Sequence, residues 1–510
     1  MLWLALSFPQ LALEVFTERL VGHDRAVIVL QDNRVRFSND VAQAANIAVG
    51  SSLATAHTID ADLIHFHRDP QAEDKRLHRL ADMLYRFSDH VSVQLPDCVL
   101  IEIGGSLRLF GSHQALCDAA IELCTELGHL SIGRCATTPW AAIALARSQQ
   151  QHLIDVPLKA AGLELAKVPA QIIERFANMG IYTLGPLLEL PSTELGKRFG
   201  PALLLYLEQL TGNVGDPRIA ITPAPSFTRE IHLLQPISDK EVLFASQHSP
   251  MQTLARELQH WLIAHQLGCE RLEWQFATAS TRKPGKAASE KGAPEKVYVP
   301  VRFARSKQNQ AEFRKVSELR LENVALPEEV LTVGLSAKRL TAWHNTSENL
   351  FKIAPATNTS DTSDATVSQN PRGNKNSNQI KLDGRAAELI DELCARLGDS
   401  ACRGVQDIVQ HTPESAWSQV TTHQLLRPTQ SAKTENPVLD TGKRPLWLFN
   451  PPRRVLRNEL HLTHGPERIQ TQWWFSTTCR DYYIAQHSNG AECWAYVDDD
   501  AHWYLHGYFA

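Results

Sequence analysis

The stretch WLALSFPQLALE, residues Trp3–Glu14, determines how the N-terminal part of the chain folds. It overlaps a short apolar run, Leu2–Leu6, whose length predicts a buried β-strand. Ser7–Gln10 has turn and helix-cap chemistry, and the apolar residues that follow have helical spacing. A strand that runs directly into a helix is a common place for a ligand or metal site in α/β domains. No carboxylate precedes Glu14, so this stretch alone predicts only a bare apolar strand.

A second strand is predicted at Val99–Ile103, directly after Asp97 and Cys98. Together the two strands resemble the palm of Y-family (translesion) DNA polymerases. The family pattern is Asp-x-Asp-x-Phe-Phe-x-x-x-Glu on the first strand and Ser-x-Asp-Glu-x-x-x-Asp on the second. On this chain the first pattern falls on Ala5, Ser7, Pro9, Gln10 and Glu14, and the second falls on Leu95, Asp97, Cys98 and Glu102.

The resemblance places the metal-binding positions at Ala5, Asp97 and Cys98, of which only Asp97 keeps a carboxylate. Two-metal phosphoryl transfer needs carboxylates that hold two divalent cations about 3.5–4 Å apart. Mg²⁺ prefers oxygen ligands, and a thiol is a poor substitute. The residues therefore predict a protein that is not an enzyme and that binds no metal or other cofactor there. The alternative is an active polymerase that uses Asp97, Glu102 and a further ligand.

The positions that would hold an incoming nucleotide are altered as well. The family pattern Tyr-x-Ala-Arg falls on Asp40–Gln43, so an anionic Asp40 and a neutral Gln43 stand where Tyr and Arg are expected. An anion that faces a triphosphate is repulsive, although Asp40 also fits a helix N-cap. The family's two phosphate-binding Lys positions fall on Thr138 and Ala142. The resemblance therefore implies that the whole nucleotide site is lost.

Residues 1–155 are interpreted as palm and fingers, and residues 156–215 as a thumb of helix–hairpin–helix type. The run NMGIYTLGPLLELP, residues 178–191, matches the hairpin pattern Leu-x-x-x-Gly-Ile-x-Thr-x-x-x-Leu. Hairpins of this kind offer backbone N–H groups to a DNA phosphate. Gly180 and Ile181 are therefore predicted to contact DNA, with a plain helical connector as the alternative.

Residues 216–342 are predicted to form an α+β domain in the order β-α-β-β-α-β. This order resembles the family's little finger, the domain that binds duplex DNA. Basic residues gather in the loop Thr281–Lys296 and just beyond it. The residues predicted to follow a DNA backbone are Lys283, Lys286, Lys291 and Arg302. A solvated hairpin tip is the alternative for the loop.

Residues 343–380 lose periodicity, and their richness in Thr, Ser, Asn and Asp predicts a disordered linker. Near its start, Leu350 and Phe351 resemble part of the sliding-clamp-binding peptide Gln-x-x-Leu-Phe, with Ser347 where Gln is expected. Two adjacent apolar side chains in an extended segment can enter a pocket on a partner. The alternative is that the pair packs on its own domain.

Residues 381–510 are predicted to contain helices at Ala386–Leu397 and Gly404–Val409, and then a small aromatic-rich antiparallel sheet. The stretches PLWLFNPP, GPERIQTQWWF, RDYYIAQ and WYLHGYFA resemble those of ImuB-type proteins, the Y-family-like subunits of a bacterial mutasome. The resemblance implies a C-terminal partner-binding region that works with an ImuA-type protein and an error-prone C-family DNA polymerase. Base stacking on the sheet is disfavoured because few Lys or Arg residues interleave with the aromatics.

The composition of the chain limits the classes of protein to which it can belong. The chain has 510 residues, of which 43% are hydrophobic and 21% charged, and a formal net charge of −5. These values predict a multidomain globular protein, and the charge means that any basic DNA-facing surface must be local. The α+β multidomain class is what the resemblance implies. Nine cysteines without a C-x-x-C pair argue for free thiols in a reducing cytoplasm. No apolar run is long enough to span a membrane, and no signal peptide is evident.

The sequence therefore predicts a non-catalytic adaptor in DNA repair and translesion synthesis, the induced mutagenesis of the SOS response. It would bind primer–template DNA and the sliding clamp in the cytoplasm, at the nucleoid after DNA damage. A protein-interaction scaffold that no longer contacts DNA is the third alternative, which a near-neutral charge permits.

Overall fold

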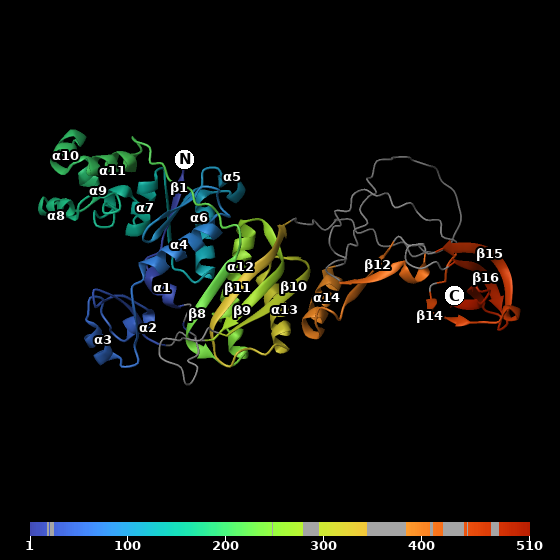
Figure 1. Ribbon diagram of the computed structural model, residues 1–510. Coiled ribbons are helices and arrows are strands. Elements are labelled where there is room, and N and C mark those ends of the chain that lie inside the picture. The colour runs from blue at the N-terminus through green and yellow to red at the C-terminus, as the bar shows by residue number, and fades with distance from the viewer. Residues whose placement is uncertain are drawn as a thin grey trace, which may run out of the picture. The chain divides into compact units, whose positions relative to one another are not determined.

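The computed structural model describes residues 1–17, 20, 25–246, 248–278, 295–343, 384–408, 412–421, 443–445, 447–470 and 479–509. The chain separates into two compact units, Met1–Thr357 and Asn358–Ala510 (Figure 1). Among the described helices, none is long and apolar enough to cross a membrane.

A four-stranded antiparallel sheet, here called the palm sheet, organises the N-terminal part of the first unit. Its strand order is β5-β6-β1-β7, with β1 in the middle beside β6 and β7. All five residues of β1 are buried because both faces of the sheet are covered. The strands are β1 (Trp3–Ser7), β5 (Val91–Gln94), β6 (Cys98–Glu102) and β7 (Ile132–Ala136).

The two faces of the palm sheet belong to different hydrophobic cores. Leu4 and Leu6 point into one core with side chains of α1 (Leu11–Thr17), α4 (Pro70–Leu84) and α6 (His113–Glu126). Trp3 and Ala5 point into the other, with α7 (Pro139–Ser148) and the helices that follow it. The alternation of side chains along β1 thus sends Ala5 toward α7.

A smaller sheet has the strand order β3-β2-β4, and its strands come between β1 and β5 of the palm sheet in the sequence. Its hairpin turns at Asp32 and Asn33, whose φ angles of 53° and 59° fit a two-residue turn between antiparallel strands. The prediction that Asp40 caps the next helix is wrong, because Asn39 accepts the N–H of Ala42 and is the N-cap. The elements are β2 (Val27–Gln31), β3 (Arg34–Ser38), α2 (Asp40–Ala44), α3 (Leu53–Ile59) and β4 (Ile64–His67), followed later by the short α5 (Leu107–Phe110) and η1 (Leu153–Asp155).

Four short helices, here called the thumb helices, form two successive helix–hairpin–helix units. The tight turns use Gly180 with φ +78° and Gly200 with φ +89°, a backbone region that favours glycine. The helices are α8 (Ala170–Asn178), α9 (Leu184–Leu188), α10 (Ser192–Phe199) and α11 (Pro201–Thr211).

A second four-stranded antiparallel sheet, here called the little-finger sheet, has the order β10-β9-β11-β8. Its elements follow the predicted β-α-β-β-α-β succession, which fits the predicted α+β multidomain class. The first helix begins at Pro250, a residue suited to the first turn of a helix. The elements are β8 (Thr228–Ile237), η2 (Glu241–Leu243), α12 (Pro250–Ala264), β9 (Leu267–Ala277), β10 (Lys296–Lys307), α13 (Gln310–Glu322) and β11 (Val330–Ala342).

The second unit contains the predicted helix, α14 (Gly384–Leu397), and a five-stranded antiparallel sheet in the order β14-β18-β17-β16-β15. The predicted helix at Gly404–Val409 is wrong. That segment is β12 (Arg403–Asp407), which pairs with β13 (Trp417–Thr421). The remaining elements are η3 (Pro413–Ser415), β14 (Trp447–Arg454), η4 (Arg457–Glu459), β15 (Leu460–Gln470), β16 (Cys479–His487), β17 (Glu492–Asp498) and β18 (Trp503–Tyr508).

Candidate functional site

Ala5 and Cys98 stand inside an apolar core rather than at an open site. Both residues are fully buried, and Ser7 pairs with Cys98 in the register of β1 and β6. Their core also contains Ala142 of α7 and Leu187 of α9. Burial, reinforced by the charge of Asp97, raises the pKa of the Cys98 thiol far above its ordinary value. A neutral buried thiol and a methyl group offer no ligand to a hard divalent cation.

Asp97, the one carboxylate left at the metal positions, is paired with a permanent cation. The guanidinium of Arg147, on α7, donates to Asp97 Oδ1 from Nε at 3.1 Å and from Nη2 at 2.5 Å, and to Glu164 Oε1 from Nη1 at 2.9 Å. Burial lowers the pKa of Arg147, but the charges of Asp97 and Glu164 more than offset this and raise it. A guanidinium thus neutralises the carboxylate that a metal ion would need.

The predicted phosphate positions serve the packing of the thumb helices instead. Thr138 is the N-cap of α7, where its hydroxyl accepts the N–H of Ala141 and donates to the carbonyl of Leu210 at 2.9 Å. Ala142 is fully buried in the same core as Ala5. Neither residue presents a cation to solvent.

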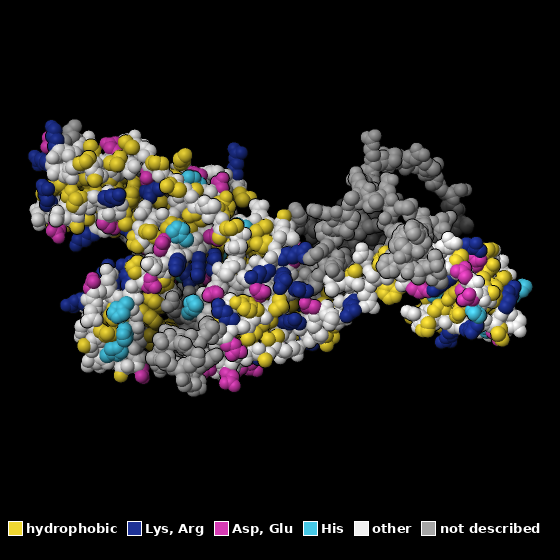
Figure 2. Space-filling view, in the orientation of Figure 1, with side chains coloured by type: hydrophobic (Ala, Val, Ile, Leu, Met, Phe, Trp, Pro, Cys, Tyr) yellow, Lys and Arg dark blue, Asp and Glu magenta, His cyan; other side chains and the backbone are white. Residues whose placement is uncertain are grey.

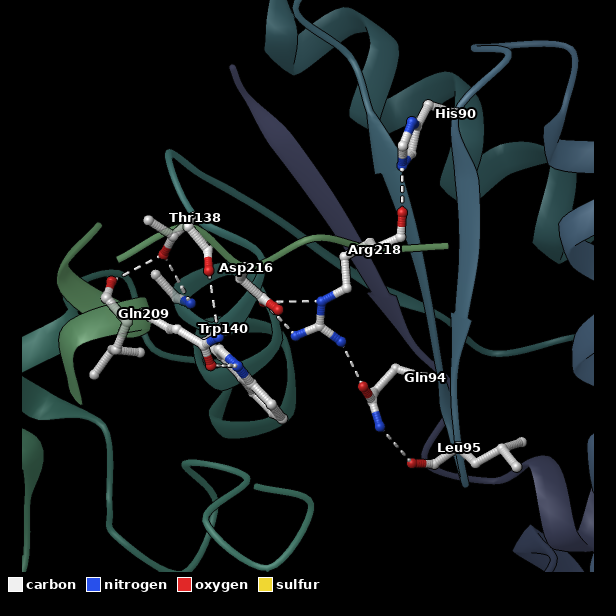
Figure 3. Close-up of polar contacts among 11 residues, drawn as sticks. His90, Gln94, Leu95, Thr138, Trp140, Gln209, Asp216 and Arg218 are labelled. Carbon is white, nitrogen blue, oxygen red and sulfur yellow. Dashed lines mark hydrogen bonds and ion pairs between the residues drawn. The ribbon is translucent and has the colours of Figure 1, made fainter. Parts of the chain in front are cut away.

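The segment after the thumb helices is fixed to the palm by Arg218 (Figure 3). Its guanidinium pairs with Asp216 Oδ2 at 2.6 Å, donates to Gln94 Oε1 at 2.6 Å and lies 4.6 Å from the centroid of a Trp140 ring. The indole N–H of Trp140 in turn donates to Gln209 Oε1 at 3.2 Å. These contacts hold α7, α11 and β5 together, and sequence reasoning did not find them because the partners are far apart in the chain.

The other altered nucleotide positions lie near α2. Gln43 is exposed and donates from its amide to the carbonyl of Ser38 at 3.0 Å, and Asp40 is exposed at the first turn of the helix. Glu102, the extra ligand of the active-polymerase alternative, accepts the backbone N–H groups of Leu2 and Gly104. None of these three side chains is brought to Asp97 by a described contact, so the palm donors do not fit a two-metal site.

Glu14 keeps the family residue but has a structural role. Its carboxylate accepts from His129 Nδ1 at 2.6 Å and from the N–H of Leu130 at 2.8 Å. His129 Nε2 lies 3.5 Å from Arg76 Nη1, which is also 3.5 Å from Glu257 Oε1 on α12. This buried chain of polar groups joins the palm helix α4 to the little-finger sheet.

Asp82, also on α4, is the most connected member of this joint. Its carboxylate accepts from Trp261 Nε1 at 3.0 Å and from the N–H of Ala224 at 3.1 Å. His265 Nε2 lies 3.3 Å from it and Arg229 Nη2 lies 3.6 Å from it. A buried carboxylate with four partners is a well-satisfied structural charge.

At the predicted hairpin contact, Gly180 is exposed and Ile181 packs partly into the thumb core. Both backbone N–H groups are used within the hairpin, since Gly180 donates to the carbonyl of Ala177 and Ile181 to that of Phe176. Their role in the fold is to shape the turn, which leaves Tyr182 exposed at its tip.

The little-finger sheet carries a row of arginines across three strands. Arg302 on β10 lies directly opposite Arg271 on β9, and Arg271 lies opposite Arg339 on β11. Lys and Arg side chains gather over these strands in the space-filling view (Figure 2). The predicted Lys283, Lys286 and Lys291 lie outside the described residues, as does the predicted clamp-binding pair Leu350 and Phe351.

One group of possible metal ligands occurs among the described residues, and it lies in the second unit. Asp498, Asp500 and His502 flank the turn between β17 and β18 with ligand atoms within 4.8 Å of one another. All three belong to a solvent-facing turn, and sequence analysis did not single them out.

Comparison with known proteins finds relatives of the palm region and of the chain as a whole. Residues 7–146 match the impB/mucB/samB family. The chain is 24% identical to Protein ImuB of Caulobacter vibrioides, strains NA1000 / CB15N and ATCC 19089, over 90% of this chain and 99% of the relative.

Among solved structures, the insertion ternary complex of Dbh DNA polymerase matches at 15% identity with a TM-score of 0.34, covering 66% of this chain and 98% of that chain. DinB from Sulfolobus solfataricus matches at 14% identity with a TM-score of 0.32, covering 68% of this chain and 100% of that chain. Residues 7–146 are therefore similar to the impB/mucB/samB family, and the chain is similar along most of its length to Protein ImuB.

Proposed function

We propose that this protein is a non-catalytic, polymerase-like adaptor that binds DNA during damage repair and translesion synthesis. The observation that supports the proposal concerns the three residues predicted at metal-binding positions. Ala5 and Cys98 are part of an apolar core, and Asp97 is paired with Arg147. Two-metal catalysis needs open carboxylates around two cations, and these residues supply a closed core and a salt bridge instead.

DNA binding by the little-finger sheet is supported by its row of arginines. Like charges directly opposite one another destabilise a sheet, yet Arg302, Arg271 and Arg339 follow one another across three strands. Glu273 and Glu270 neutralise part of this charge, at 3.8 Å from Arg271 and 2.8 Å from Arg339. The side chains of Arg271 and Arg339 remain 38% and 41% exposed, so DNA phosphates would reach them from solvent, in keeping with a chain whose total charge is slightly negative.

The proposed partners follow from the resemblance to ImuB-type proteins. The pair Leu350 and Phe351 would bind the sliding clamp, and residues 381–510 would recruit an ImuA-type protein and an error-prone C-family DNA polymerase. A clamp-binding assay with Leu350→Ala and Phe351→Ala combined should lose binding, and binding that survives both changes would contradict the peptide assignment. The proposed location is the cytoplasm, at the nucleoid after DNA damage.

The DNA-binding part is tested by the affinity of the full chain for a labelled primer–template, measured by fluorescence anisotropy at several salt concentrations. Charge reversal at Arg271→Glu and Arg302→Glu should weaken binding and lower its salt dependence, because each lost phosphate contact releases fewer counterions. The matched control is Lys75→Glu with Arg108→Glu, two exposed residues outside the sheet that change the net charge equally. Equal losses in both variants, or no loss in the first, would refute the proposed surface.

A further inference from the structure

Both faces of the five-stranded sheet in the second unit carry aromatic side chains, and the exposed Trp447 lies on one of them. Trp447 on β14 lies directly opposite Tyr508 on β18, and Tyr508 lies opposite Cys493 on β17. Because directly opposed residues share a face, Trp447 and Tyr508 stand on the same side. We call this side the aromatic face, and it carries Trp447, Phe449, Tyr483, Trp503 and Tyr508.

The centre of the aromatic face consists of small, buried side chains, whereas a side chain at its margin is exposed to solvent. Ala485, Cys493 and Ala495 are fully buried beneath the larger rings. Phe449 and Tyr508 pack edge-to-face with ring centroids 5.7 Å apart. Trp447 beside them is 81% exposed, so most of its ring is left in contact with water. A single exposed apolar residue needs no explanation, but an exposed Trp continuous with an aromatic cluster indicates a binding surface.

Arginines lie against the aromatic rings of this face. The guanidinium of Arg453 lies 4.3 Å from the centroid of Phe449, and that of Arg457 lies 5.1 Å from a ring of Trp503. Within the part of the chain that the structure describes, Arg453 makes no ion pair with a carboxylate. A cation stacked on a ring without an anionic partner leaves its charge available to an anion.

β14 is an edge strand of the sheet, and its part of the aromatic face is here called the β14 end. It carries the exposed ring of Trp447 and, further along the strand, the exposed Arg453. Acidic groups also lie nearby, because the N–H of Val455 donates to the carbonyl of Trp503, which follows the turn Asp498–Asp500. The exposed ring of Trp447 and the guanidinium stacked on Phe449 favour an anionic ligand with flat rings at the β14 end.

We propose that the β14 end of the aromatic face binds single-stranded nucleic acid. Bases would stack on Trp447 and at the edge of Phe449, while Arg453 pairs with a backbone phosphate. This site deepens the proposed function, on which it rests, because it gives the adaptor a surface for unpaired template that is separate from the duplex surface. Sequence analysis disfavoured stacking here because few Lys or Arg residues interleave with the aromatics, whereas the structure places the guanidinium of Arg453 over the ring of Phe449.

Two neighbouring arginines provide a matched pair of variants. Arg453 lies opposite Leu505, which belongs to the core under the aromatic face, whereas Arg454 lies opposite Tyr504, which packs on the other face. Both arginines are exposed. Arg453→Glu and Arg454→Glu therefore change the net charge equally, and only the first changes the aromatic face.

The test measures binding of the full chain to a fluorescein-labelled oligothymidine of about 16 nucleotides. We expect Trp447→Ala combined with Arg453→Glu to weaken this binding about tenfold or more, since stacking on one aromatic residue is worth that much. Arg454→Glu should have a much smaller effect. Equal effects of the two charge reversals, or unchanged binding in the double variant, would overturn the proposal.

A second measurement locates the bound strand and separates this site from the duplex surface. Photocrosslinking to a bromodeoxyuridine oligonucleotide should label the tryptic peptide of residues 444–453, which contains Trp447 and Phe449. The double variant should keep its affinity for fully paired DNA, whereas Arg271→Glu with Arg302→Glu should keep the crosslink. Crosslinks found only in the first unit would overturn the proposal. A double variant that loses binding to a protein partner but still binds oligothymidine would also overturn it.

Discussion

Within the first unit, the palm contacts the thumb helices and the little-finger sheet through two interfaces, here called joints. The two joints differ in chemical character. The joint with the thumb helices is an apolar core that runs from Ala5 and Cys98 through α7 to Leu187. The joint with the little-finger sheet is a buried set of charged and polar groups around Asp82, Arg76 and Glu257. Ala5 and Cys98, the positions that sequence reasoning aligned with catalytic carboxylates, are packed in the apolar joint, whereas the buried carboxylates of the other joint connect two parts of the unit.

The difference has consequences for how each joint tolerates change. Apolar contacts are non-directional and adapt to changes of shape, but they exclude charge. Buried ion pairs need every partner, because removing one leaves another charge buried without compensation. The thumb joint should therefore fail when a charge is added, and the little-finger joint should fail when a charge is removed.

The largest effect is expected when a carboxylate is restored to the thumb joint. Ala5→Asp should lower the free energy of unfolding by more than about 4 kcal/mol, because an unpaired charge would be buried in the apolar core. Denaturant unfolding measures the loss. Ala115→Asp is the control, since Ala115 is exposed in the first turn of α6, where an acidic residue is favourable. Wild-type stability of Ala5→Asp would show that the site is open to water.

The next effect is expected at the little-finger joint. Asp82→Ala should cost about 3–5 kcal/mol, because Trp261, Arg229 and His265 would lose their shared acceptor. Hydrogen exchange of α4 and α12 checks this directly, since both helices should lose protection. Asp74→Ala, on the same helix but with a half-exposed ion pair to His78, should change little. Unchanged exchange at α12 would mean that the network does not join the two parts.

The little-finger joint should also weaken in acid. Burial, with help from Arg86 and Arg256, lowers the pKa of His260 to about 4. Between about pH 6.5 and 4 the unfolded chain binds a proton that the folded chain excludes, so stability falls as the pH falls, by up to about 3 kcal/mol. His260→Gln should flatten this part of the stability profile, and His78→Gln should not. If the stability profile of His260→Gln were unchanged, His260 would not be the group that weakens the protein in acid.

The smallest effect is expected from the salt bridge between Arg147 and Asp97. Arg147→Ala should cost about 1–3 kcal/mol, because Asp97 would lose its charged partner in a partly buried place. A double-mutant cycle with Asp97→Ala should show coupling of the two residues. Arg198→Ala, which breaks an exposed pair with Glu194, should stay within about 0.5 kcal/mol. Strict additivity at Arg147 and Asp97 would contradict the pairing.

The parts that sequence could predict were those set by local pattern. The strand predicted at Leu2–Leu6, which the structure has at Trp3–Ser7, and the order of elements in the little-finger sheet follow from apolar spacing and turn residues. The interpretation of Ala5 and Cys98 as lost metal ligands also rests on the residue types alone, and it stays a prediction. None of these inferences needs a contact between distant parts of the chain.

The contacts that were missed all depend on distant partners. Arg147 and Asp97 are 50 residues apart, and Asp82 and Trp261 are 179 residues apart. On an amphipathic helix such as α4, a charged residue is expected to face solvent, so the burial of Asp82 cannot be inferred from its own segment. The strand at Arg403–Asp407 was misassigned for the same reason, because it is defined by pairing with Trp417–Thr421.

The central claim is that the protein binds DNA without extending it. The direct measurement is primer extension by the purified full chain with Mg²⁺ and separately with Mn²⁺, with DNA binding recorded in the same samples. The account predicts salt-sensitive binding and no nucleotide addition with either metal. Nucleotide addition that disappears in Asp97→Ala would contradict it, because that result would require a working metal site where the structure places Arg147, Ala5 and Cys98.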